Sequence, residues 1–185
     1  MTRKSLGNQH SMVVQPAFII GTYSENGVAN FAPITWISVT WENDYYMLVV
    51  SMNGSKQTKR NLTINKAVLS ANLVSTDMLM LMDYFGSCSG KENAKDAIQY
   101  DYSNGVTLNV PTLDMSKWVY ECEVSKIGQT GDSDTYFCKI VDVSVDETID
   151  ISNGIDLTLF DPVIYSGHYH SIGECLGKIG DFYNC

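Results

Sequence analysis

The side chains best suited to hold an anion lie together in residues 51–61 of this chain. The segment reads Ser51-Met52-Asn53-Gly54-Ser55-Lys56-Gln57-Thr58-Lys59-Arg60-Asn61. Asn53-Gly54 is typical of a turn, and Ser55 predicts the N-cap of a helix over residues 55–65. The first amide N–H groups of such a helix have no partners within it, and the helix dipole favours an anion there. The segment therefore predicts a phosphate site, to which Lys56 adds charge and Thr58 a hydroxyl group.

A solvated helix face is the alternative interpretation of the same segment. The protein has 12 basic residues and a formal net charge of -9. Lys56, Lys59 and Arg60 form a short charge run of the kind that usually faces solvent. On a helix, Lys59 and Arg60 project away from Lys56 and Thr58, so we expect both to stay in solvent. Asn61 lies one turn after Thr58, where it either reaches the ligand or caps a loop carbonyl.

A second segment, Ala32-Pro33-Ile34-Thr35-Trp36-Ile37-Ser38, is suited to a flat ring. Its first four side chains are short enough for backbone N–H and C=O groups to approach a planar heterocycle. A tryptophan in a β-rich protein more often belongs to the core or to an interface, so Trp36 has two interpretations. We therefore assign the predicted contact chiefly to the backbone of this segment.

Both segments resemble the flavin reductase-like family, whose members bind FMN in a split β-barrel and include flavoredoxin. In that family a loop similar to residues 30–36 lies against the isoalloxazine ring, and a Lys-x-Thr-x-x-Asn segment similar to residues 56–61 holds the phosphate. The resemblance runs from residue 12 to residue 182. Its further matches are Ala71-Asn72-Leu73-Val74, Val110-Pro111-Thr112, Tyr120-Glu121-Cys122-Glu123-Val124, Ile164-Tyr165-Ser166-Gly167 and Ile172-Gly173-Glu174.

The resemblance also implies which residues contact the cofactor. They are Ala32, Pro33, Ile34, Thr35, Trp36, Ser38, Ser51, Met52, Asn53, Ser55, Lys56, Thr58, Asn61 and Asn72. The family's C-terminal segment approaches the flavin where nicotinamide would stack, which makes His168, Tyr169 and His170 candidates for the substrate face. Two histidines at i and i+2 share a strand face, but no carboxylate or cysteine at ligand spacing completes a metal site. We therefore expect no metal, and the alternative role of this segment is at the surface or at a subunit contact.

The implied function is that of an FMN-binding oxidoreductase, an NAD(P)H-dependent flavin reductase that passes a hydride from nicotinamide to flavin N5. Because the cofactor supplies the reactivity, no dedicated general base is required, and no Ser-His-Asp, Cys-His or paired-carboxylate arrangement stands out. Without a Gly-x-Gly-x-x-Gly fingerprint, NAD(P)H would bind transiently over the flavin. The alternative is a flavoredoxin-like electron carrier that lacks NAD(P)H activity and exchanges electrons with a redox partner protein. A third interpretation is a split-barrel module for another ligand such as haem.

Length and charge favour a single-domain protein and disfavour nucleic-acid binding. A chain of 185 residues predicts one domain over residues 1–185, with a core from about 12 to 182. Residues 1–100 carry eight basic and seven acidic side chains, whereas residues 101–185 carry four and 14, so the two parts have net charges of +1 and -10. An anionic cofactor should therefore bind mainly to the first part. No extended basic stripe favours nucleic-acid binding.

Cysteine usage and hydropathy predict a cytoplasmic protein. Five cysteines give an odd count without a Cys-x-x-Cys pair or zinc spacing, as expected for a reduced cytosolic chain. No apolar run reaches the ~18 residues of a membrane span, and the N-terminal residues do not resemble a secretion signal. We therefore expect no membrane association.

The expected fold is mainly β with flanking helices, a six-stranded antiparallel split β-barrel of Greek-key type. Predicted strands cover residues 18–23, 28–31, 36–41, 45–52 and 67–74, with turns at Ser24-Glu25-Asn26-Gly27 and Glu42-Asn43-Asp44. Besides residues 55–65, a helix is predicted over 77–85, which Thr76 would cap and Gly86 would end. A further short helix is predicted over 90–97.

A hairpin of residues 118–126 and 134–145 has a register predicted from charge. The predicted pairs are Cys122 with Cys138, Glu121 with Lys139, Lys126 with Asp134 and Tyr120 with Ile140. Opposite charges and apolar side chains then face one another. A disulfide between Cys122 and Cys138 is conceivable by position, but the cytosolic redox state favours two packed thiols in the core.

A homodimer is the last expectation. Trp36, Trp41, Tyr45 and Tyr46 are apolar side chains that a partner subunit would cover beside the edge strands of a small barrel. Members of the family that this chain resembles build the flavin cleft between two subunits.

Overall fold

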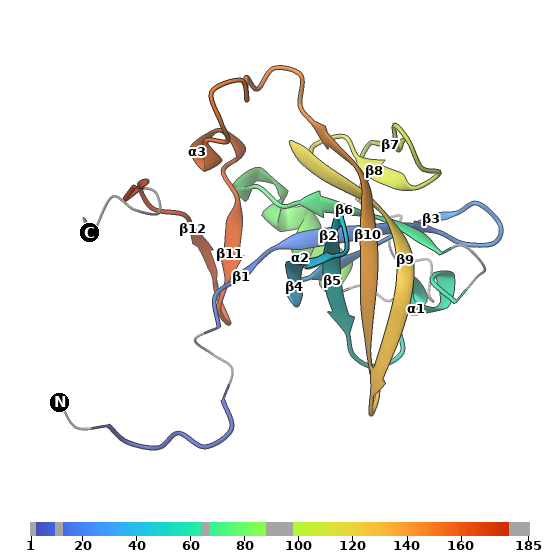
Figure 1. Ribbon diagram of the computed structural model, residues 1–185, viewed down its shortest axis with the longest axis horizontal. Coiled ribbons are helices and arrows are strands. Elements are labelled where there is room, and N and C mark those ends of the chain that lie inside the picture. Colours follow the sequence, from blue (N-terminus) through green and yellow to red (C-terminus); the bar gives the residue numbers. More distant parts are fainter. Residues whose placement is uncertain (1–2, 10–12, 64–66, 88–97, 178–185) are drawn as a thin grey trace.

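The computed structural model of the protein describes residues 3–9, 13–63, 67–87 and 98–177. Strands predominate over short helices (Figure 1). The strands are β1 (Gln15–Pro16), β2 (Phe18–Tyr23), β3 (Ala29–Ile34), β4 (Ile37–Glu42), β5 (Tyr45–Met52), β6 (Val68–Leu73), β7 (Tyr102–Asn104), β8 (Pro111–Leu113), β9 (Trp118–Thr130), β10 (Ser133–Val145), β11 (Val163–Tyr165) and β12 (Tyr169–Ser171). The helical elements are α1 (Gln57–Asn61), a 3₁₀ turn, η1 (Thr76–Met78), α2 (Leu79–Ser87) and α3 (Leu157–Phe160).

The main sheet contains seven antiparallel strands in the order β3-β2-β6-β9-β10-β5-β4. Its two outer strands, β3 and β4, are joined by only Thr35 and Trp36. Two residues cannot span a flat seven-stranded sheet, so the sheet must curl until its edges approach each other. The Ser51 N–H donates to the Trp36 carbonyl at 2.9 Å at this meeting point. The expected antiparallel split barrel is confirmed, with seven strands in the main sheet where we expected six.

The strand predictions that rest on alternating apolar residues and turn chemistry are confirmed. β2 and β5 have the predicted bounds. The turn before β3 places Gly27 at a φ of 74°, and the turn between β4 and β5 places Asn43 at 54°. Glycine and asparagine tolerate this left-handed conformation, which explains why these turns were readable in the sequence.

Two apolar cores lie on opposite faces of β2. Ile20 joins the barrel interior with Leu48, Leu69 and the two buried thiols Cys122 and Cys138. Ile19 packs instead against a second cluster, formed with Phe31 and the helical residues Met78, Met82 and Phe85. The strand is buried on both faces because α2 covers its outer side. The predicted packed thiols are confirmed, since both cysteines are free and fully buried.

The predicted hairpin exists, but its predicted register is wrong. The strands continue to a two-residue turn in which Gly131 has a φ of 59°, so Thr130 pairs with Ser133. Two bulges then shift the pairing. The observed pairs include Cys138 with Val124, Lys139 with Glu123, Ile140 with Cys122, Asp142 with Glu121 and Asp134 with Gln129. Bulges change which residues face each other, and charge alternation alone does not reveal them.

The second helical prediction is confirmed in position and corrected in its cap. The segment begins as the turn η1, whose N-cap is Ser75, and continues as α2 to Ser87. Thr76 hydrogen-bonds the Asp161 carboxylate instead of capping the helix. The helix predicted over residues 90–97 lies outside the described residues.

A separate sheet of β1, β11 and β12 stands at one end of the barrel beside α3, at the left of Figure 1. Its strands β11 and β12 follow the acidic connection that leaves the long β9–β10 hairpin. Residues 3–9 stand away from the barrel on this same side.

Candidate functional site

A small hollow of about 150 Å³ lies where β3 meets β4 and β5 ends. Its walls come from two chain segments that are distant in sequence and that both appear among the predicted cofactor residues. The lining residues are Pro33, Ile34, Thr35, Trp36, Ser51, Met52, Asn53 and Lys56. The structure therefore brings the ring-side segment and the start of the phosphate-side segment together at one place.

The sheet register fixes this hollow. Ser51 pairs with Thr135 of β10, and the two hydroxyl oxygens are 2.9 Å apart. Trp36 is tied to Ser51 through its backbone carbonyl, while its side chain is 41% exposed. The Thr35 carbonyl accepts from the Ile37 N–H at 3.0 Å. Hydrogen bonds thus hold the backbone around the hollow in place, and Lys56 is the cation among its lining residues.

The predicted helix start is wrong in three respects. α1 covers five residues, its N-cap is Lys56 in an extended conformation, and no side chain caps it. Ser55 is therefore outside the cap position. The helix ends because the Thr63 N–H and hydroxyl both donate to the Arg60 carbonyl, at 3.1 and 2.7 Å. A single turn of helix has a small dipole, so an anion here would depend on Lys56 and on local N–H groups.

The polar residues on the inner side of α1 face the barrel. Thr58 is 1% exposed, and its hydroxyl oxygen accepts from Asn30 Nδ2 at 3.0 Å. Asn61 is also buried; its Nδ2 donates to the Thr22 hydroxyl at 3.0 Å, and its Oδ1 accepts from Gln57 at 2.8 Å. Both ends of the Asn61 amide thus have internal partners, and the side chain joins α1 to β2.

The outer side of α1 borders a larger, open hollow of about 570 Å³. Ser55, Lys56, Lys59 and Arg60 line it, opposite the tip of the β9–β10 hairpin. The expectation that Lys59 stays in solvent is wrong. Its Nζ lies 2.8 Å from the Asp134 carboxylate and donates to the Asp132 carbonyl at 3.0 Å. The hydrogen bond from Lys59 lowers the pKa of Asp134. Arg60 is exposed as expected, and Lys56 belongs to both hollows.

Three further predicted cofactor residues, like Ser55, Thr58 and Asn61, do not line the small hollow. Ala32 is buried in β3, and Ser38, near the start of β4, lines a neighbouring apolar groove. Asn72 is fully buried and has internal partners for both ends of its amide. Its Nδ2 donates to the Ile19 carbonyl and to Ser70, at 2.9 and 3.0 Å, and its Oδ1 accepts from the Leu113 N–H at 2.8 Å.

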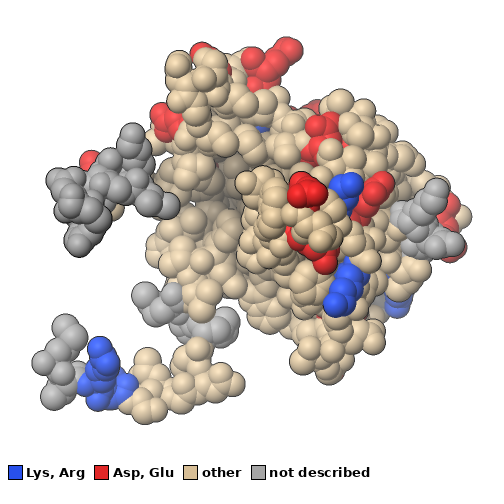
Figure 2. All heavy atoms as spheres, in the orientation of Figure 1, with Lys and Arg blue, Asp and Glu red and all other residues tan. Residues whose placement is uncertain are grey.

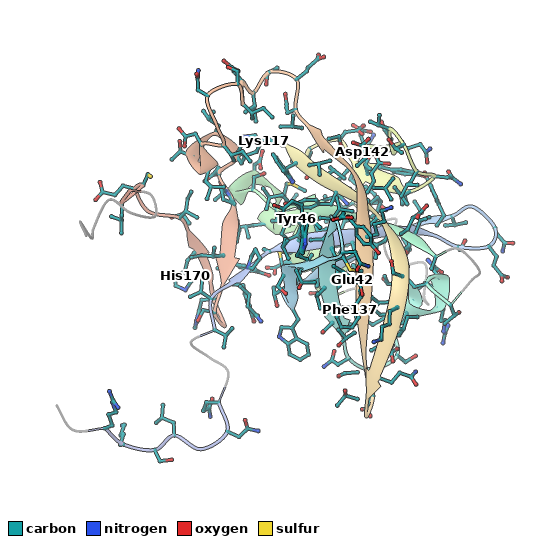
Figure 3. All side chains as sticks on the ribbon, in the orientation of Figure 1. Glu42, Tyr46, Lys117, Phe137, Asp142 and His170 are labelled. Atoms are coloured by element: carbon teal, nitrogen blue, oxygen red, sulfur yellow. The ribbon has the colours of Figure 1, made fainter. Side chains whose placement is uncertain are left out.

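The C-terminal histidine segment lies far from α1 within one chain. Figure 1 shows β12 and α1 at opposite sides of the molecule. His170 stands apart from Glu42, Tyr46 and Phe137 of the barrel (Figure 3). Tyr169 donates its hydroxyl to Asp83 at 2.6 Å, and burial together with this carboxylate raises its pKa to about 12. Among the described residues, no group of three or more His, Cys, Asp or Glu side chains forms a metal site.

Sequence reasoning missed the residues that hold the site in place. Thr22 and Thr135 supply partners from strands far along the chain, and no local pattern marks them; Asn30 lies in the predicted ring-side segment, but its contact with Thr58 was not predicted. Glu121 was predicted to pair with Lys139, yet it is fully buried. Its carboxylate accepts the N–H groups of residues 106, 107 and 108 at 2.6, 3.0 and 2.6 Å. Such a buried charge is stable only because it is fully hydrogen-bonded.

Comparison with known proteins identifies the family. The model of the flavin reductase like domain matches residues 10–173. The chain belongs to this family. A search of curated protein sequences gave no match.

Several solved structures share the fold of this flavin reductase-like chain. Flavoredoxin from Methanosarcina acetivorans has a TM-score of 0.87 at 21% identity, covering 98% of this chain and 97% of that chain. Flavoredoxin of Desulfovibrio vulgaris (Miyazaki F) has a TM-score of 0.88 at 23% identity, covering 97% and 98%. The FMN-binding protein from Thermus thermophilus with bound p-hydroxybenzaldehyde has a TM-score of 0.77 at 22% identity, covering 96% and 97%.

Charge is unevenly spread on the molecular surface. Figure 2 shows acidic side chains along the upper edge, above α3 and the connection from β10, and basic side chains on the N-terminal segment at the lower left. Within the described ranges, no helix has the length and apolar character of a membrane-crossing segment.

Proposed function

We propose that this protein binds FMN at the small hollow and acts as a flavoredoxin-like electron carrier. The observation that carries the proposal is that eight residues expected to touch the cofactor line one hollow, although they come from two separate segments. Belonging to the flavin reductase-like family supports a flavin as the ligand. The high TM-scores of two flavoredoxins over nearly the whole chain favour the carrier over the reductase that the sequence placed first.

The proposed cofactor contacts follow from the geometry. The carbonyls of Thr35 and Trp36 are already used within the protein, so the ring edge would take N–H donors from this connection. Ser51 is fixed by Thr135 and offers a hydroxyl group of defined position. Lys56, with Asn53 and Ser55 beside it, would hold the phosphate. Bound FMN would supply the redox chemistry, while these residues bind it, orient it and shield one face of the ring from water.

Thr58, Asn61 and Asn72 have a different role in this proposal. Their side chains are buried and already hydrogen-bonded, so they shape the site without touching the cofactor. They are positioning residues.

Two experiments test the proposal. The visible spectrum of the freshly purified protein, with FMN added if the protein is colourless, should show a bound flavin that mass spectrometry identifies as FMN. A protein whose spectrum and fluorescence do not respond to FMN contradicts the proposal. Steady-state oxidation of NADH and NADPH then separates the two functions, since a carrier turns over slowly with both unless a partner protein is present.

An NAD(P)H-dependent flavin reductase is the second candidate. The family name and a fold shared with the flavin reductase PheA2, at a TM-score of 0.69 and 17% identity, support it. Rapid NAD(P)H oxidation with free FMN as acceptor would favour this function over the carrier.

The protein is also proposed to be a homodimer. Trp36, Trp41 and Tyr46 are 41%, 55% and 60% exposed on or beside the edge strand β4, and Trp41 contacts Tyr46 with ring centroids 4.7 Å apart. Because β12 lies far from α1 in one chain, a second copy is the natural source of His168 and His170 at the flavin. Light scattering should give twice the chain mass, and a strict monomer that still binds FMN tightly contradicts the shared cleft.

A further inference from the structure

An apolar groove of about 560 Å³ lies next to the small hollow, along the part of β4 that directly follows Trp36. Its floor includes Phe18 and Ile37 of the barrel together with the aromatic rings of Trp118 and Phe160, which meet edge to face at 5.6 Å. The small sheet supplies the opposite wall through Ile164 of β11. The proposed flavin contacts use none of these residues.

The rim of this groove remains exposed although it is apolar. Val39, Ile155 and Leu157 line the groove and are 55%, 56% and 53% exposed. Exposed apolar side chains around one concavity are typical of a surface that another chain covers.

The connection that supplies part of this rim is rich in acidic residues, although none of them lines the groove and Lys117 donates to the Leu159 carbonyl at 3.3 Å. Residues 140–167 contain six acidic side chains and no lysine or arginine. Asp156 lies between Ile155 and Leu157, and it caps α3 by accepting the Thr158 N–H at 2.9 Å. The hydrogen bond from the Thr158 hydroxyl, at 2.7 Å, and that from its N–H lower the pKa of Asp156. The groove therefore suits an occupant that combines apolar and positively charged side chains.

The N-terminal segment has this composition. Its residues Arg3 and Lys4 are basic, Leu6 is 68% exposed, and no acidic residue precedes Glu25. Val14 lines the groove, so the segment leaves the barrel at the groove's own rim. Residues 3–9 nevertheless stand away from their own barrel (Figures 1 and 2).

We infer that residues 3–9 of one chain dock in this apolar groove of a second copy, with Leu6 in the groove and Arg3 and Lys4 against the acidic connection. Charge complementarity favours this groove as the docking site, and the outward course of the segment favours a second copy over the segment's own chain. The inference rests on the homodimer of the proposed function and adds which segment and which surface join the two copies.

Exchange of the segment is tested with two single variants mixed together. One chain carries Leu6→Cys and the other Leu157→Cys, both with Cys88, Cys175 and Cys185 replaced by serine. Neither chain alone can join position 6 to position 157. Mild oxidation of the mixture should give a covalent dimer that contains one chain of each kind, verified by mass spectrometry of the linked peptides. Leu6→Cys mixed with Met80→Cys, whose native side chain is 70% exposed on α2, is the control and should give little crosslink.

Further measurements distinguish docking in a second copy from docking within the same chain and from non-specific crosslinking. A double variant in one chain that forms only an internal disulfide would show docking in the same chain and overturn the inference. So would a crosslink yield no higher than that of the Met80 control. The charge-reversed segment, Arg3→Glu with Lys4→Glu, should raise the dimer dissociation constant at least about tenfold.

Two outcomes separate this inference from the proposed function. An unchanged dimer constant in the charge-reversed variant overturns segment docking while the homodimer stands. Wild-type protein that is monomeric, or that binds no FMN, refutes the proposed function itself. The charge-reversed variant should still bind FMN, because the segment lies outside both hollows.

Discussion

The two sides of helix α1 differ in a way that separates ligand residues from scaffold residues. On the inner side, Thr58 and Asn61 are buried and hydrogen-bonded to β3, β2 and the helix itself. On the outer side, Lys56 and Arg60 have no carboxylate partner within 4.0 Å among the described residues. One Lys-x-Thr-x-x-Asn pattern therefore contains both kinds of residue. Truncating the inner residues should cost stability, and truncating Lys56 should cost affinity.

The largest effect on stability is expected at Asn61. Asn61→Ala leaves the Thr22 hydroxyl and the Gln57 amide without a partner, so the free energy of unfolding should fall by about 1–3 kcal/mol. Urea denaturation of the flavin-free protein measures it. The FMN affinity of the folded variant should change little. Thr58→Ser is the matched comparison on the same side, because it keeps the hydroxyl group that accepts from Asn30.

A smaller effect is expected at Lys59, and it should depend on pH. Lys59 lowers the pKa of Asp134, so this pair stabilises the folded state above the unfolded pKa of about 3.9. The contribution is lost as the pH falls through the lower, folded pKa. Stability curves of wild type and Lys59→Ala should therefore differ at neutral pH and converge in acid. Lys126→Ala removes the same charge at an exposed position. Its difference in stability from wild type should stay the same between neutral pH and acid.

The smallest effect is expected at Arg60. Its side chain is exposed and forms no ion pair with a residue that the structure describes, so Arg60→Ala should change the free energy of unfolding by no more than about 0.5 kcal/mol. A large loss of stability in this variant would show that the outer side of α1 is also scaffold and would remove the contrast.

Local sequence chemistry predicted much of the fold. The bounds of β2 and β5 and the turns at Gly27 and Asn43 follow from side-chain alternation and left-handed turn residues. The hairpin register failed because bulges and the two-residue turn at Gly131 decide the pairing, and these depend on the whole sheet.

The candidate site also contains parts that the sequence predicted and parts that it did not. The segments that line the small hollow were visible in the sequence, because each is continuous and has a distinctive composition. The positions of Thr58, Asn61 and Asn72 were not, because their partners come from distant strands. A polar residue beside a predicted site looks the same in sequence whether it binds a ligand or an internal partner.

The most direct test of the account is the affinity of Lys56→Ala for two flavins, measured by fluorescence quenching at fixed ionic strength. Riboflavin lacks the phosphate, so a phosphate contact affects FMN alone. Losing one charge-assisted hydrogen bond of about 1.5–3 kcal/mol should weaken FMN binding roughly 10- to 150-fold, with riboflavin nearly unchanged. Lys126→Ala, which removes the same charge outside both hollows, should leave both constants unchanged. Equal losses for the two flavins in Lys56→Ala, or no loss for either, would contradict a phosphate site at this residue.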